Sequence, residues 1–120
     1  MREEMLKSIL SDLNGSSADI EASAVISTDG LTIASLLAGN MDEDRVGAMA
    51  AAMLSLGDRT AAELARGELE QVMIKGDSGY VLLIHAGHDA VLTVIARKEA
   101  KLGLIFLDAK RAAQGIAELL

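Results

Sequence analysis

Two histidines form the most obvious candidate for metal chemistry in this chain. His85 and His88 make an H-x-x-H sequence, and the imidazole nitrogen is a common ligand of zinc. We expect His85 at the end of a strand and His88 in a turn, so their rings need not converge. Asp77 and Asp89 are the nearest acidic side chains that could complete a site. Because no second pair of ligands is evident, we predict an ordinary hairpin with exposed histidines and no bound metal.

A second candidate is Gly76-Asp77-Ser78-Gly79, which resembles the residues around the nucleophile of chymotrypsin-like serine proteases. Tyr80 stands where those enzymes continue with Gly, and the chain is too short for their two barrels. Gly, Asp and Ser are turn formers, so this sequence predicts a turn. The loops that cradle nucleotide phosphates, G-x-x-x-x-G-K-[ST] and G-x-G-x-x-G, are absent. We therefore predict a protein that is not an enzyme and holds no cofactor.

Composition narrows the classes of partner. The 120 residues are enough for one domain with a core, and we interpret residues 1–120 as a single domain. The 11 basic and 18 acidic residues give a net charge of −7, which disfavours binding to nucleic acid phosphates. Tyr80 and Phe106 are the only aromatic residues, too few for a base-stacking platform. The charged start of the chain and the broken apolar stretches indicate neither a signal peptide nor a membrane span. We expect a cytoplasmic protein that binds neither nucleic acid nor membrane.

Hydrophobic periodicity and turn signals predict eight elements in the order α-β-β-α-β-β-β-α. Apolar residues at three- and four-residue spacing indicate helices, and alternation or short apolar runs indicate strands. Asp29-Gly30 is a strong hairpin signal, and short connections between the later strands make the sheet mostly antiparallel. We predict an α/β fold of the α+β type, in which one five-stranded sheet has helices on both faces. The expected helices are 2–13, 40–66 and 102–120, and the expected strands are 20–27, 31–37, 68–75, 80–86 and 90–96.

The central helix is apolar or small on nearly all sides. Asn40 and Glu43 resemble a capping box at its start. A helix of this kind is buried on more than one side, so we interpret its second face as a contact with another helix, in a homodimer or a partner protein. Alternatively, alanine serves there only as a good helix former on a solvent face. The face expected to cover the sheet carries Val46, Met49, Met53, Leu56, Thr60 and Leu64. The expected interface carries Gly47, Ala48, Ala51, Ala52, Ser55, Arg59 and Ala62.

The loop at 97–101 is a further candidate for contact with a partner. It is charged and precedes the last helix. Arg97 and Lys98 could meet an acidic partner, although a solvated connection is the simpler interpretation.

Three local sequences and the order of elements together resemble the Roadblock family, also known as dynein light chain or MglB-like domains. The resemblance covers nearly the whole chain, and it depends on order and length because the family has no catalytic signature. The matching pieces are the hairpin Ala24-Val25-Ile26-Ser27-Thr28-Asp29-Gly30-Leu31, the Ala- and Met-rich central helix ending near Leu64, and the last helix with Leu102-Gly103-Leu104-Ile105 and Ala109-Lys110-Arg111-Ala112-Ala113.

This resemblance implies a non-catalytic module that regulates or scaffolds a small Ras-like GTPase. Family members usually dimerise through the central helix and the strand after it, which gives one continuous sheet across the dimer. Some prokaryotic members stimulate GTP hydrolysis by reshaping the GTPase's own site, whereas others are scaffolds. The chain lacks the long tail extensions of some gliding-motility members, so scaffolding stays open beside GTPase activation. The other hypothesis is a small ligand-sensing or signalling scaffold domain, for which Tyr80 and His85 are the few candidate polar groups of a pocket.

Overall fold

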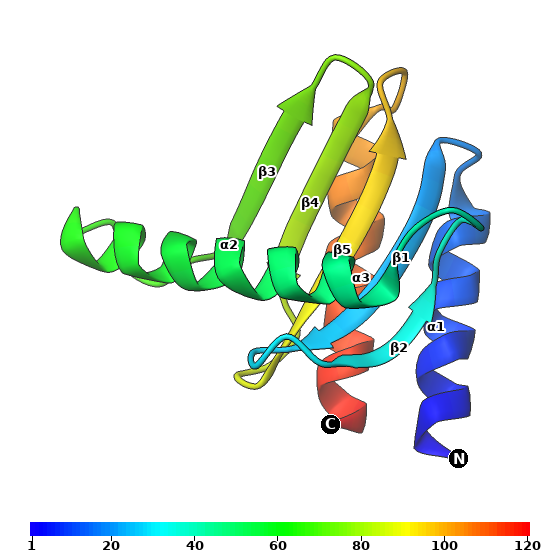
Figure 1. Cartoon of the computed structure of the whole chain (residues 1–120), viewed down its shortest axis with the longest axis horizontal. Helices are drawn as coiled ribbons and strands as arrows, with labels where there is room; N and C mark the ends of the chain where they lie inside the picture. Colours follow the sequence, from blue (N-terminus) through cyan, green and yellow to red (C-terminus); the bar gives the residue numbers. More distant parts are fainter.

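A sheet of five strands separates two helical layers in the computed structural model, which describes residues 1–120 (Figure 1). Helices α1 and α3 cover one face of the sheet, and α2 crosses the other face. The order of elements and the fold class predicted from the sequence are confirmed. The helices are α1 (Arg2–Ser16), α2 (Glu43–Glu63) and α3 (Leu102–Leu119), and the strands are β1 (Ile20–Ser27), β2 (Thr32–Leu36), β3 (Gln71–Gly76), β4 (Gly79–His85) and β5 (Ala90–Arg97).

The strands lie in the order β2-β1-β5-β4-β3, and every neighbouring pair is antiparallel. Three of these pairs are hairpins between strands consecutive in the chain. The pairing of β1 with β5 is instead long-range, with Val25 opposite Leu92 at its centre. This pairing places β5 in the middle of the sheet and leaves β2 and β3 as its two edges.

Helix α2 is shorter than predicted at both ends. Asp42, not Asn40, caps its first turn, because the Asp42 side chain accepts hydrogen bonds from the backbone nitrogens of Asp44 at 2.9 Å and Arg45 at 3.3 Å. The helix stops before Ala65, whose φ of 56° lies in the left-handed region that often ends helices. The local capping chemistry therefore sets the length of α2.

The two faces of the sheet are packed to different extents. On the face covered by α1 and α3, 17 buried residues form the main core, with Leu6, Leu10 and Ile116 packed with Leu92. On the α2 face the buried cluster has six residues, and Leu54 is the only large fully buried side chain that α2 contributes. Helix α2 is therefore the less deeply anchored of the two layers.

Candidate interaction surface

Helix α2 faces the sheet with small residues, which corrects the orientation predicted from its sequence. A Cβ on Gly47 would lie 2.6 Å from the carbonyl oxygen of Gly30, and a Cβ on Gly57 would lie 2.8 Å from Cγ2 of Val72. The two glycines therefore let the helix approach the sheet more closely than any side chain would allow. The sheet-facing side is made by Gly47, Ala50, Leu54, Gly57 and Ala61.

The large apolar side chains expected against the sheet lie along one flank of α2 instead. Met49 is 60%, Leu56 is 58% and Leu64 is 65% exposed, and only Met53 is packed against the buried cluster of this face. Such a row of exposed apolar side chains is unusual on a helix that is partnered only by its own sheet. We call Met49, Met53, Leu56, Thr60 and Leu64 the apolar stripe of α2.

The residues predicted as an interface divide into two groups. Gly47 is buried against the β1–β2 turn, and Ala51, one turn further along the helix, is half-buried. These two residues contact their own chain, because the helix is rotated relative to the predicted orientation. The other five remain exposed on the outer side of α2 and form what we call the alanine face: Ala48, Ala52, Ser55, Arg59 and Ala62.

A polar contact joins α2 to the sheet on the side of the helix opposite the apolar stripe. His85 Nε2 lies 3.0 Å from Oδ1 of Asp58, which links the helix to the last residue of β4. Ala62 lines the same cavity as His85 and His88. This flank therefore points to the end of the sheet at which β4 finishes, and the apolar stripe points to the opposite end, where β1 and β4 begin.

A row of apolar residues on the sheet, beside the apolar stripe, is covered only in part, with Ile74 exposed and Val81 and Ile95 half-buried. Ile74 pairs with Val81, and Val81 pairs with Ile95, so the three side chains share the face that α2 covers. The neighbouring residues of this face, Leu83 and Thr93, are 1% and 2% exposed beneath α2, whereas Ile74 is 41% exposed. A cavity of about 390 Å³ opens over all three residues. We call Ile74, Val81 and Ile95 the bare row.

Edge strand β3 and the end of α2 lie next to this row. Figure 1 shows the C-terminal turns of α2 projecting past β3, beyond the edge of the sheet. Met73 of β3 is 42% exposed on the opposite face, so the edge strand shows apolar side chains on both of its faces. The projecting turns, the edge strand and the bare row form one continuous unpartnered surface.

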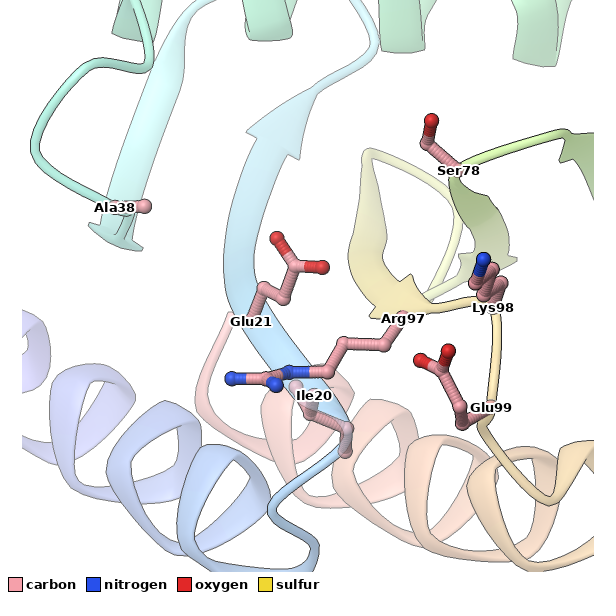
Figure 2. Close-up of a pocket in the computed structure, with 7 residues that line it drawn as sticks. All are labelled: Ile20, Glu21, Ala38, Ser78, Arg97, Lys98 and Glu99. Carbon is pink, nitrogen blue, oxygen red and sulfur yellow. The ribbon is translucent and has the colours of Figure 1, made fainter.

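A polar cavity of about 600 Å³ adjoins the bare row where β5 ends (Figure 2). Figure 2 shows Arg97 extending across it toward β1, with Glu21 on β1 and Ser78 on the β3–β4 turn around it. Lys98 and Glu99 follow in the loop. None of these charged side chains takes part in any of the ion pairs of the structure. The cavity therefore holds two cations and two carboxylates that form no ion pair with one another.

The residues that suggested chemistry do not assemble into a reactive centre. No three His, Asp or Glu side chains gather in a geometry that could hold a metal ion. Ser78 lies in a two-residue turn, as its sequence predicts. Tyr80 and His85, the polar groups considered for a sensing pocket, lie on opposite faces of the sheet, opposite Ala96 and Val91 respectively. None of the helices is long and apolar enough to cross a membrane.

Comparison with known proteins identifies the family. The sequence model of the Roadblock/LC7 domain family matches residues 6–96 of this chain. The chain belongs to this family. A relative from Methanocaldococcus jannaschii is 44% identical over 112 residues, which cover 93% of this chain and 96% of the relative. The Roadblock/LC7 domain from Streptomyces avermitilis is 27% identical, with a TM-score of 0.72 over 92% of this chain and 96% of that one. A structure of MglB with a tetrameric arrangement has a TM-score of 0.88 at 20% identity, over 98% of this chain and 89% of that one, and it shows the same fold.

The sequence did not reveal two parts of this surface of the Roadblock/LC7 domain. The bare row forms only when β3, β4 and β5 pair, and the sequence does not show which of their residues then lie side by side. The sequence shows only that each member of the row is a β-branched residue in a predicted strand. The projection of α2 past β3 depends on how the helix crosses the sheet. A helix of 21 residues is about 31 Å long, which exceeds the width of five strands spaced at about 4.8 Å. The length of the helix was therefore the one feature of the sequence that indicated the projection.

Proposed function

We propose that this Roadblock/LC7 domain is a non-catalytic module that forms a two-fold homodimer and, as a dimer, regulates or scaffolds a small Ras-like GTPase. The observation that carries the proposal is the unpartnered surface in which the end of α2 projects past an open strand edge, beside a bare row of apolar residues. This surface is complementary to a second copy of itself, because the projecting end of α2 in one copy can cover the bare row of the other.

The geometry of such a dimer follows from the position of α2. A two-fold axis normal to the sheet beside β3 pairs β3 with β3 of the second copy in antiparallel fashion, so one sheet continues across both copies. The same rotation turns α2 of the second copy over the end of the sheet where the bare row lies. The two α2 helices then run antiparallel with their apolar stripes facing each other, and the C-terminal turns of each α2 cover the bare row of the other copy.

This arrangement leaves the alanine face free for another partner. Ala48 and Ala52 are exposed on the outer side of α2, away from the sheet. Small side chains permit close approach of a second protein, and the two-fold places two such faces on the same side of the dimer. We assign this surface to the GTPase. Membership of the Roadblock/LC7 family and the shared fold with MglB support this choice of partner.

The test has two stages. Light scattering after size exclusion at micromolar concentration should give the mass of a dimer, and a monomer would contradict the proposal. Binding should then be measured to small GTPases encoded near this chain's gene, each loaded with GDP or with a GTP analogue. The chain alone should give no heat with GTP and magnesium in a calorimetric titration, because it lacks a phosphate-cradling loop. Saturable GTP binding by the chain, or no binding to any such GTPase, would count against the assignment.

A further inference from the structure

We propose that Arg97 and Lys98 hold the C-terminal end of α2 from the second copy, so that the polar cavity is completed only in the homodimer. This inference rests on the homodimer proposed above. It assigns the basic loop to self-association rather than to the GTPase, and it names the group that each cation meets.

The cavity lies where the projecting helix must end. Glu21 and Ser78 line both the polar cavity and the apolar cavity over the bare row, so the two are continuous. Arg97 lies two residues beyond Ile95 on β5 and therefore on the same face of the sheet. A helix that lies along the bare row from the β3 side passes Ile74 and Val81 and reaches Ile95 with its last turn. The next side chains that it meets are those of the cavity.

The charges of the two partners are complementary. Arg97 and Lys98 form no ion pair in their own chain, where Glu21 and Glu99 are the carboxylates that line the same cavity. The last turn of α2 has no basic residue, and its Glu63 carboxylate is largely exposed, with Arg59 as its only ion-pair partner. A helix C-terminus also carries partial negative charge on its last carbonyl groups, which favours nearby cations.

The last carbonyls of α2 are only partly satisfied within the chain. Ala61 and Ala62 accept hydrogen bonds from the backbone nitrogens of Arg66 and Ala65, respectively. Arg66 Nε donates to the Leu64 carbonyl at 3.1 Å. The Glu63 carbonyl accepts none of the backbone hydrogen bonds at this helix end. This carbonyl and the Glu63 carboxylate are therefore the acceptors that we assign to Arg97 and Lys98 of the second copy.

The test is a charge swap measured by sedimentation equilibrium in low salt. The double variant Arg97→Glu with Lys98→Glu should raise the dissociation constant of the homodimer by about tenfold or more, and the effect should shrink as salt screens it. Adding Glu63→Lys to that variant should restore much of the lost affinity, because the swapped charges attract again. Lys110→Glu with Lys7→Glu, which reverses two charges on the α1 and α3 side, is the matched control and should change little.

Each outcome separates this inference from the homodimer itself. A wild-type chain that stays monomeric at every concentration would overturn both. A stable dimer whose dissociation constant responds to the loop variant no more than to the control would overturn the assignment of Arg97 and Lys98 alone. Unchanged self-association with lost GTPase binding would also overturn it, and would assign the two cations to the GTPase. A loss of affinity that Glu63→Lys fails to restore would show that the cations meet a different group.

Discussion

The two edges of the sheet are built differently. β2 has five residues, and a register shift opposite Val25 and Ile26 leaves Ile33 as a bulge. The start of α2 lies against this strand, where the Ser35 hydroxyl donates to the Glu43 carboxylate at 2.9 Å. β3 has six residues in unbroken register with β4. Its Met73 and Ile74 side chains are exposed, and no element lies beside its open edge.

This difference indicates which edge pairs with another chain. A short strand with a bulge and nearby carboxylates is a common protection against unwanted pairing of strands, because it misaligns the hydrogen-bonding groups and repels a neighbour. A regular edge with exposed apolar residues is instead a template for a further strand. The contrast supports a homodimer through β3 and not through β2.

Among the variants that test this difference between the two edges, Ile74→Lys should weaken the homodimer most. It places a charge in the bare row beneath the second copy's helix, and a charge buried without a partner at the centre of an interface is strongly unfavourable. The dissociation constant should rise at least about 100-fold, as measured by sedimentation equilibrium. Ser35→Lys on β2 is the matched control. Equal weakening by both variants would mean that the two edges do not differ in function.

Leu56→Glu should have the next largest effect, because it puts a charge on the apolar stripe between two α2 helices. We expect the dissociation constant to rise about 30-fold. Ala52→Glu adds the same charge one turn away on the alanine face, and should leave the dimer intact while weakening GTPase binding. Dissociation of the dimer by Ala52→Glu, with little effect of Leu56→Glu, would reverse the roles that we assign to the two sides of α2.

Thr93→Val lies in the middle of the sheet, away from both edges. It should therefore change the free energy of unfolding of the monomer and not the association of the two copies. The Thr93 hydroxyl is buried beneath α2 and has no hydrogen-bond partner. Replacing it by a methyl group should raise the free energy of unfolding by about 1 kcal/mol, because an unsatisfied buried hydroxyl is removed. Ser23→Ala should do the opposite, because Ser23 Oγ donates to Asn14 Oδ1 at 2.6 Å. Both effects should appear in urea unfolding of the monomeric Ile74→Lys background.

Asp58→Asn should have the smallest effect. It weakens the contact to His85 Nε2 that holds α2 on the side of the sheet away from the bare row. Both side chains are partly exposed, so the free energy of unfolding should fall by only about 0.5 kcal/mol. The dissociation constant of the dimer should stay within about twofold. A large loss of self-association would show that this contact, and not the β3 edge, controls the position of α2.

The sequence by itself determined the elements and their order. The Asp29-Gly30 turn, the two-residue Asp77-Ser78 turn and the apolar periodicity of the last helix are local signals, because neighbouring residues alone decide these conformations. The hairpins fixed most of the antiparallel pairing in the same way. The local sequences that resemble the Roadblock family also lie within single elements, so the family was evident before the arrangement in space.

The tertiary structure decided how α2 sits and what lies around it. The sequence shows an apolar side and a small-residue side of α2, but large side chains were expected inward and glycines face the sheet instead. That choice depends on how closely the Gly30 carbonyl and Val72 approach the helix, which no local pattern encodes. The long-range pairing of β1 with β5 likewise brings Glu21 beside Arg97 and leaves β3 at an edge. The interaction surface arises from these distant contacts, because residues far apart in the chain meet only after the sheet has formed.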